Sequence, residues 1–241
     1  MKALRTTALA AALLTVGMAG TAHAALSVSG SVGGAPTGVV LDNLDWLTLG
    51  TAGGLSPQSG ITITITPNAQ AVQGSVAGQY AAPFLSGGNG AGFGNPIGTN
   101  QPNGVDTTTY LTSGSTGATA GAAITIELPF DALYFGLLWG SVDNYNTLSF
   151  FDGDTLVGSI TGSDVTASPN GDQGVNGTLY VNITSTIAFN KIVATSSQFA
   201  FEFDNLAFSE RDPNDVPEPG TLALLGLGLL GVGALRARRR A

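Results

Sequence analysis

Apolar and polar residues alternate in short runs along the middle of the chain, and Gly, Asn, Asp and Ser separate the runs. A period of two is typical of β-strands with one buried face, whereas the 3.6-residue period of amphipathic helices is nearly absent. The clearest run is residues 61–66, in which Ile and Thr alternate strictly. The strands that this pattern predicts are residues 61–66, 123–128, 133–139, 147–151, 155–160, 179–183, 191–195 and 199–208.

Three local features refine these strands. Pro129 is expected to end the strand before it, because proline cannot donate a ladder hydrogen bond. Residues 133–139 are apolar throughout, which predicts a central strand covered on both faces. Asp152, Gly153 and Asp154 separate two of the runs and indicate a hairpin turn of the Asp-Gly type.

Aromatic residues recur at every second position in the last predicted strand, which puts them on one face. We expect this face to be buried together with two apolar residues of the central strand. The residues expected in this core are Phe199, Phe201, Phe203, Leu137 and Trp139. Leu206 and Phe208 have the opposite parity, and a β-bulge at Asp204–Asn205 would return them to the core.

A Gly-rich segment over residues 87–121 interrupts the strands. It is rich in Asn, Ser and Thr and has few large apolar residues, so we expect a long loop or insertion. It contains no Lys, and a phosphate-binding loop would need one. The strands over residues 25–210 therefore predict an all-β body, an antiparallel β-sandwich of a jelly-roll-like type.

The first 24 residues have the parts of a secretory signal peptide. Lys2 and Arg5 form a basic start, and a short apolar stretch follows them. Ala22 and Ala24 have the small-x-small spacing that signal peptidase accepts, so we expect cleavage after Ala24. The apolar stretch is too short to span a hydrocarbon core of about 30 Å.

The other end of the chain has a linker, an apolar run and a basic tail over residues 211–220, 221–235 and 236–241. The tail arginines are Arg236, Arg238, Arg239 and Arg240. A helix over the apolar run would cover about 22 Å, which is short for a span unless the bilayer thins. We expect a single transmembrane helix here, with the arginines in the cytoplasm and the body outside the inner membrane.

The run Val216-Pro217-Glu218-Pro219, the Gly-interrupted apolar stretch and the terminal arginines together resemble a PEP-CTERM protein-sorting signal. Tails of this kind are also catalogued as the C-terminal segment of ice-binding proteins. The resemblance covers residues 215–241. It implies recognition by a membrane-embedded exosortase, removal of the tail near Pro-Glu-Pro, and delivery to the surface of a Gram-negative bacterium that makes extracellular polysaccharide.

A second resemblance lies in the body of the chain. Residues 139–147, with the sequence Trp-Gly-Ser-Val-Asp-Asn-Tyr-Asn-Thr, and residues 150–153 resemble the sandwich core of a subset of exosortase-dependent surface proteins. In that subset Asp-Asn also occurs in the final strand, as Asp204–Asn205 does here. The resemblance covers about residues 124–208 and implies no activity.

The composition excludes several kinds of chemistry. The chain has no Cys, and its one His lies in the predicted signal peptide. Disulfides, thiol nucleophiles, histidine bases and Cys- or His-ligated metals are therefore excluded from the mature protein. Residues 25–215 carry fifteen Asp and Glu against Lys191 and Arg211, a net formal charge of −13. Such a surface repels nucleic acid and anionic lipid, and it is compatible with cations or neutral glycans.

Calcium suits the remaining side chains, because it prefers carboxylate and amide oxygens. Asp152, Asp154 and Asp143 lie near predicted loops and form the candidate calcium site, to which Asp204–Asn205 could add a further pair. The alternative is that the Asp-Gly-Asp run is an ordinary turn. Asp106, in the Gly-rich segment, is expected to lie outside the site.

Two further activities depend on specific residues. Two carboxylates suffice for a glycosidase, and Glu127 and Glu202 are the candidate pair, unless both are solvent-facing strand residues. Ice binding would use Thr62, Thr64 and Thr66, but no second alternating Thr run occurs. A single strand with Ile facing inward and Thr facing outward is favoured.

We therefore expect an exported, exosortase-processed protein of the cell surface or extracellular matrix, associated with biofilm or exopolysaccharide, without catalysis and without a required cofactor. The alternatives are a calcium- or glycan-binding module and, after these, a glycosidase or an ice-binding protein. The expected partners are signal peptidase, exosortase, the inner membrane before processing and extracellular polysaccharide, and nucleic acid is not among them.

Overall fold

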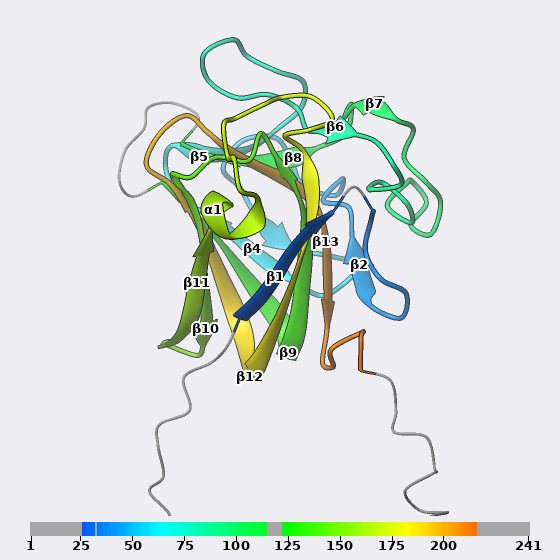
Figure 1. Cartoon of the computed structure of the whole chain (residues 1–241), viewed down its shortest axis with the longest axis vertical. Helices are drawn as coiled ribbons and strands as arrows, with labels where there is room; N and C mark the ends of the chain where they lie inside the picture. Colours follow the sequence, from blue (N-terminus) through cyan, green and yellow to red (C-terminus); the bar gives the residue numbers. More distant parts are fainter. Residues whose placement is uncertain (1–25, 32, 115–121, 216–241) are drawn as a thin grey trace, which may run out of the picture.

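The computed structural model describes residues 26–31, 33–114 and 122–215, so the predicted signal peptide, sorting motif, apolar run and basic tail lie outside the described residues. The described part consists almost entirely of β-strands (Figure 1). Its elements are β1 Leu26–Ser31, β2 Val40–Asp42, β3 Gly54–Leu55, β4 Thr62–Ile65, β5 Ala69–Val72, β6 Phe84–Leu85, β7 Gly104–Val105, β8 Tyr110–Ser113, β9 Ala123–Gly140, β10 Asn146–Asp152, β11 Thr155–Thr161, α1 Gly162–Val165, β12 Leu179–Ser196 and β13 Phe201–Ser209.

Eleven of the described strands form one large antiparallel sheet, while β6 and β7 pair separately. This confirms the all-β prediction. Two 18-residue strands, β9 and β12, pair with each other and carry different neighbours at their two ends. The first part of β9 pairs with β4 and its last part with β13. Likewise β1 pairs with the first part of β12 and β10 with its last part.

The two long strands correct the prediction that each is two separate strands. Residues 123–128 and 133–139 are joined in β9, and Pro129 is exposed within it. The β9–β12 register passes from the pair Glu127–Lys191 directly to the pair Ala132–Phe189, so Pro129 faces no partner on β12. Proline is tolerated there because the ladder requires no N–H from it. The prediction that Pro129 ends the strand is therefore wrong.

The main core lies between the two groups of strands that β9 and β12 connect. It combines residues from the first part of β9, from β4 and β10, and from the last part of β9 and β13. Fully buried members include Ile124, Phe150, Leu137, Trp139, Phe201 and Phe203. The indole ring of Trp139 lies 4.4 Å from the Phe201 ring, centroid to centroid. Four of the five predicted core residues are thus confirmed.

Phe199 is the exception among the predicted core residues. Its side chain is 40% exposed, because β13 begins only at Phe201 and residue 199 belongs to the preceding loop. The predicted β-bulge is confirmed, since the β9–β13 register shifts between Asp204 and Ala207. Residue 205 has a φ of 54° within this bulge. As a result, Leu206 and Phe208 are fully buried despite their parity.

The described part of the Gly-rich segment, residues 87–114, contains strands where a long loop or insertion is predicted. It contains β7 and the core strand β8, and it supplies the fully buried rings of Phe93 and Tyr110. A second apolar cluster forms where this segment covers the outer face of β9, β12 and β13. The members of this cluster are Leu85, Phe93, Tyr134, Leu138, Tyr180 and Ala207. The central strand is therefore covered on both faces, as its continuous apolar run predicts.

Two other local predictions are confirmed. β10 and β11 form a hairpin in which Asp152 pairs with Thr155, so the two turn residues are Gly153 and Asp154. Gly153 has a φ of 56°, which glycine adopts readily at the first position of a two-residue hairpin turn.

On β4 and the residue before it, Ile61 and Ile63 are buried while Thr64 is exposed, as the inward-Ile, outward-Thr interpretation requires. The neighbours of Thr62 on the adjoining strands are Glu127 and Leu55. A charged and an apolar residue therefore flank Thr62, whereas Thr64 pairs with Thr125.

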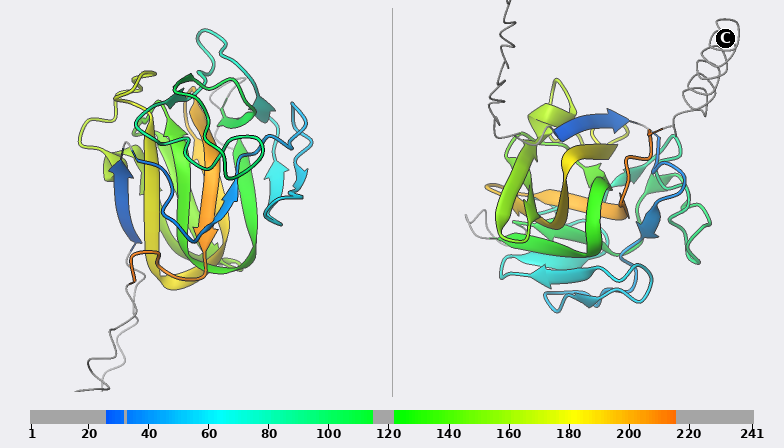
Figure 2. Two further views of the ribbon diagram at one scale, coloured as in Figure 1. Left: turned by 90° about the vertical axis from the view of Figure 1, so that its right-hand side faces the viewer. Right: turned by 90° about the horizontal axis from the view of Figure 1, so that it is seen from below.

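The described chain enters and leaves the body at the same end. In Figures 1 and 2, the start of β1 and the segment that follows β13 lie at the end that carries the β10–β11 turn, and the loop over residues 73–83 lies at the opposite end. We call these the proximal and distal ends. The one helix in the described ranges, α1, has four residues, and no helix there is long and apolar enough to cross a membrane.

Candidate functional site

A cleft of about 680 Å³ opens at the distal end of the body, and we call it the distal cleft. Its walls come from residues 75–81, 141–145, 170–173 and 199–202. These segments are the loop after β5, the loop between β9 and β10, the loop before β12 and the start of β13. Four segments distant in the sequence therefore meet where the central strands end.

Glu202 lies at the base of the distal cleft and is only 2% exposed. Its Oε1 accepts a hydrogen bond of 2.9 Å from the Ala81 N–H, and its Oε2 accepts one of 2.5 Å from the Ser141 hydroxyl. Burial raises the pKa of Glu202 to about 7, although both hydrogen bonds oppose the shift, and the charge of Asp143 adds to it. This carboxyl group therefore changes its charge near neutral pH.

Asp143 and Tyr145 form the neighbouring wall of the distal cleft. The Tyr145 hydroxyl lies 2.5 Å from Asp143 Oδ2 and 2.8 Å from the carbonyl oxygen of Phe199, and it can donate its proton to either. Burial raises the pKa of Asp143, and the hydrogen bond from Tyr145 opposes the shift. The pKa of Tyr145 is raised by burial and then by its interaction with Asp143. Tyr145 therefore remains a protonated donor at physiological pH.

The lining of the distal cleft combines aromatic rings with amide groups. Tyr80, Tyr145 and the exposed ring of Phe199 supply apolar surfaces, while Asn170 and Gln173 supply donors and acceptors. A cleft of this kind can hold a neutral ligand that has both apolar faces and hydroxyl groups. The net charge of the body opposes anionic ligands.

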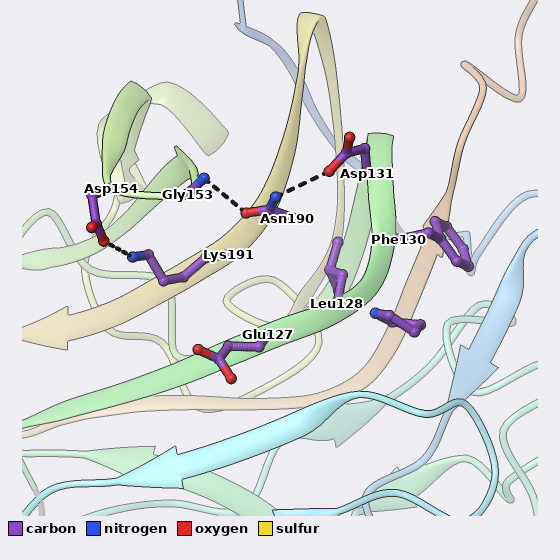
Figure 3. A pocket seen from close by; sticks show the side chains of 9 residues that line it. Glu127, Leu128, Phe130, Asp131, Gly153, Asp154, Asn190 and Lys191 are labelled. Carbon is purple, nitrogen blue, oxygen red and sulfur yellow. Dashed lines mark hydrogen bonds and ion pairs between the residues drawn. The ribbon is translucent and has the colours of Figure 1, made fainter.

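A second, smaller pocket of about 480 Å³ lies at the proximal end, between β9, β12 and the β10–β11 turn (Figure 3). Lys191 donates to Asp154 across 2.9 Å, which lowers the pKa of Asp154 through the hydrogen bond and then through the charge. Asn190 accepts from the Gly153 N–H and donates to Asp131, each at 3.0 Å. These contacts connect the hairpin turn to the two long strands.

The predicted glycosidase pair is divided between the two pockets. Glu127 lines the proximal pocket, whereas Glu202 lines the distal cleft. The interpretation of both as solvent-facing strand residues is correct for Glu127, which is exposed, and wrong for Glu202. Loops that pack over the outer face of β13 bury Glu202, and a single strand pattern carries no information about them.

The predicted calcium residues are not brought together either. Asp152 and Asp154 lie at the β10–β11 turn, while Asp143 precedes the other end of β10. The seven residues of β10 span about 20 Å, so the three carboxylates share no site. Asp154 is instead paired with Lys191. Within the described ranges, no three His, Cys, Asp or Glu side chains are grouped to hold a metal ion.

Asp106 belongs to the part of the Gly-rich segment that packs on the body, and it is only 1% exposed. Ser141 and Tyr145 also line the distal cleft, and neither residue is predicted as a site residue from the sequence. Both residues lie within residues 139–147, which resemble part of a subset of exosortase-dependent surface proteins. That resemblance implies no activity, so it does not identify them as site residues.

Comparison with known proteins identifies the end of the chain. Residues 215–240 match the family model of the PEP-CTERM protein-sorting motif. The chain carries a PEP-CTERM sorting motif. This confirms the resemblance drawn from Pro217-Glu218-Pro219 and the arginines, and it implies that exosortase processes the protein for export and sorting to the surface of a Gram-negative bacterium. No curated protein matches the sequence.

Proposed function

We propose that the protein is a non-catalytic component of the cell surface or extracellular matrix, which exosortase releases from its membrane anchor and which associates with exopolysaccharide in biofilm. The observation that carries this proposal is the sorting motif at residues 215–240. In this scheme signal peptidase removes residues 1–24, and residues 221–235 form a transient transmembrane helix in the inner membrane. The acidic body has a charge that disfavours nucleic acid as a partner.

The absence of catalysis is supported by the residues available to the body. The chain has no Cys, and its one His precedes the expected cleavage site. Glu127 and Glu202 line different pockets, whereas a glycosidase requires its two carboxyl groups within about 10 Å across one cleft. A binding or structural role needs no such pair.

We also propose that the body is a jelly-roll-like β-sandwich. Its two layers would be the two groups of strands that β9 and β12 connect. One apolar core made from residues of both groups supports this arrangement.

Intact-mass measurement of protein recovered from the cell surface or medium tests the sorting proposal. We expect a chain that begins at Ala25 and lacks the arginine-rich tail. Replacing Pro217, Glu218 and Pro219 together with Ala should leave the tail attached and the protein in the membrane. Pro213→Ala, which lies outside the matched motif, is the matched control and should be processed normally. Recovery of a released chain that still carries Arg238–Arg240 contradicts exosortase processing.

A more specific role for the body is recognition of a neutral glycan in the distal cleft. Sugars present apolar C–H faces that pack on aromatic rings and hydroxyl groups that bond to amides, and the distal cleft offers both. Phe199 supports this assignment because its ring is 40% exposed at the rim of the cleft although the rest of the aromatic run is buried.

Binding of neutral glucose, galactose and mannose oligosaccharides, measured by calorimetry, tests this role. We expect saturable binding by the wild-type protein and at least tenfold weaker binding by Phe199→Ala. Leu55→Ala is the control, since Leu55 is also exposed but lies outside the distal cleft. Binding that is unaffected by Phe199→Ala contradicts the assignment to the distal cleft.

A further inference from the structure

A group of buried oxygen atoms lies beneath the Gly-rich segment, on the outer face of β13. Asp204 and Asn205 are fully buried, and Asp106 is 1% exposed. No donor lies in good hydrogen-bond geometry to either carboxylate oxygen of Asp204, to Asp106 Oδ2 or to Asn205 Oδ1, although the Asp106 side chain and the Asn205 backbone N–H lie next to the Asp204 carboxylate. Buried polar atoms in folded proteins are nearly always paired, so four unpaired oxygens in three neighbouring side chains require an explanation.

Asp42 provides a contrast within the same protein. It is also fully buried, but its carboxylate accepts four hydrogen bonds, from the Leu44 N–H, the Trp46 indole N–H and the hydroxyl groups of Ser56 and Ser59. The fold therefore supplies donors to a carboxylate where the carboxylate serves only to organise a loop. It supplies none of comparable geometry to Asp204.

Local hydrogen bonds hold the side chains around Asp204 in place. The Thr108 N–H and hydroxyl both donate to Asp106 Oδ1, at 2.8 and 2.6 Å, which leaves Oδ2 free. Asn205 Nδ2 donates to Gln101 Oε1 at 2.6 Å, which leaves Asn205 Oδ1 free. In each case the contact fixes one atom of the side chain and leaves an oxygen available.

The charge of this region is not balanced by a basic side chain. Burial raises the pKa of Asp204 well above its usual value, and the charge of the neighbouring Asp106 and a side-chain interaction with the same residue add to the shift. The Asn205 backbone N–H opposes the shift, and the charge of Asp45 adds a smaller increase. The basic residues of the described part are Lys191, which pairs with Asp154 at the proximal end, and the exposed Arg211. A proton or a bound cation must therefore offset the negative charge.

We propose that Asp204, Asp106 and Asn205 bind a divalent cation, and that the cation is calcium. Two carboxylates and an amide oxygen are hard donors of the kind that calcium prefers, and backbone carbonyls and water commonly complete its coordination. The set contains two acidic residues rather than three, so it is compatible with the absence of a larger acidic cluster in the described ranges. Asp106 comes from the Gly-rich segment and the other two from the β13 bulge.

Calcium would therefore connect the Gly-rich segment to the central strand of the body. The Gly-rich segment has few other large apolar contacts besides Phe93 and the start of β8. A cation that binds only the folded chain stabilises it in proportion to the logarithm of its concentration. The site would thus couple the stability of the outer layer to the calcium of the extracellular medium.

Calorimetric titration of the processed protein with CaCl2, after treatment with a chelator, tests this assignment. We expect about one calcium ion per chain, and a rise in melting temperature that exceeds the rise in NaCl of equal ionic strength. Asp106→Asn should weaken binding at least tenfold and remove the calcium-specific rise. Asp152→Asn, at the exposed β10–β11 turn, is the matched control and should change neither quantity.

Three results would overturn the assignment. The first is the absence of saturable calcium binding by the wild-type protein, a measurement that does not depend on whether a variant folds. The second is unchanged binding by both Asp106→Asn and Asp204→Asn. The third is loss of binding in Asp152→Asn. If calcium does not bind and Asp106→Asn raises the melting temperature at neutral pH, the two carboxyl groups share a proton instead.

Discussion

Glu202 and Asp204 point to the same outer face of β13 and are both buried, but only Glu202 has hydrogen-bond donors in good geometry. The loop after β5 covers Glu202, and the Gly-rich segment containing Asp106 covers Asp204. The opposite face of the same strand carries Phe201 and Phe203 in the main core. One face of β13 therefore packs in the apolar core, and the other face carries two buried acidic residues that different loops cover.

The raised pKa of Glu202 predicts a specific dependence of stability on pH. A carboxyl group whose pKa rises from 4.5 to about 7 on folding binds its proton more tightly in the folded state. The contribution of this group to the free energy of unfolding is fully present below about pH 4.5 and is lost as the pH rises through 7. The loss amounts to roughly 3 kcal/mol, because each unit of pKa shift corresponds to about 1.36 kcal/mol. Glu202→Gln should lack this loss, because its amide can accept from Ala81 and donate to Ser141.

Denaturant unfolding of both proteins at pH 4.5 and pH 8 measures this effect. The difference in unfolding free energy between the wild-type protein and Glu202→Gln removes the contributions of the other titrating groups. It should change by roughly 3 kcal/mol between the two pH values in favour of the variant at pH 8. Glu127→Gln, which replaces an exposed carboxylate outside the distal cleft, is the matched control. Parallel curves for Glu202→Gln would contradict the raised pKa.

The aromatic run before and within β13 predicts two contrasting substitutions. Phe201 is fully buried, and its ring centroid lies 4.4 Å from that of Trp139 and 5.2 Å from that of Phe203. Phe201→Ala should lower the unfolding free energy by about 3–5 kcal/mol, because it leaves a cavity in the core. Phe199→Ala removes the same group from an exposed position and should cost less than about 1 kcal/mol. Similar losses for the two variants would contradict the position of β13.

The features predicted correctly from the sequence are those set by neighbouring residues. The alternation of Ile and Thr fixes which side of β4 is buried, and the glycine in Asp-Gly-Asp favours the hairpin turn. The parity change between Phe203 and Leu206 identifies the bulge, because both residues must reach the same core. Each inference uses only the two-residue period of a strand.

The features predicted wrongly depend on contacts between distant segments. The residues next to Pro129 predict that a strand ends there. In the structure Pro129 lies within β9, at a point where β12 does not pair with β9 and no ladder hydrogen bond is required of it. The same limitation applies to the candidate sites. The two-residue period of the strand places Glu202 and Asp204 on the face opposite Phe201 and Phe203, which suggests that they are exposed to solvent. They are buried because loops from about 100 residues earlier in the chain pack over this face.

The contacts at the proximal pocket predict unequal effects for two neighbouring polar groups. Asn190 is partly buried and connects the Gly153 N–H to Asp131, so Asn190→Ala should cost about 1 kcal/mol through two lost hydrogen bonds. Asp154 is fully exposed, and solvent screens its ion pair with Lys191. Asp154→Asn should leave the melting temperature unchanged within error. A larger loss for Asp154→Asn than for Asn190→Ala would show that the ion pair, rather than Asn190, holds the hairpin turn.

The shared location of both described chain ends predicts how the body is oriented before processing. The segment that follows β13 leads into the sorting motif, which begins at residue 215, and lies at the proximal end with the β10–β11 turn, while the loop over residues 73–83 lies at the distal end (Figures 1 and 2). An anchored chain should therefore hold the distal cleft away from the membrane. The linker over residues 211–220 extends at most about 35 Å, which limits how far the body can turn.

The absence of cysteine allows this orientation to be measured with single substitutions. Leu156→Cys, beside the β10–β11 turn, and Ala77→Cys, in the distal loop, both replace exposed residues and can carry a fluorescent label. In membranes from cells without exosortase, quencher lipids should quench the label at position 156 more strongly than the label at position 77. Chains that end before residue 221 should be quenched equally weakly at both positions. Stronger quenching at position 77 in the anchored chain would mean that the distal cleft faces the membrane, where it could not bind an extracellular glycan.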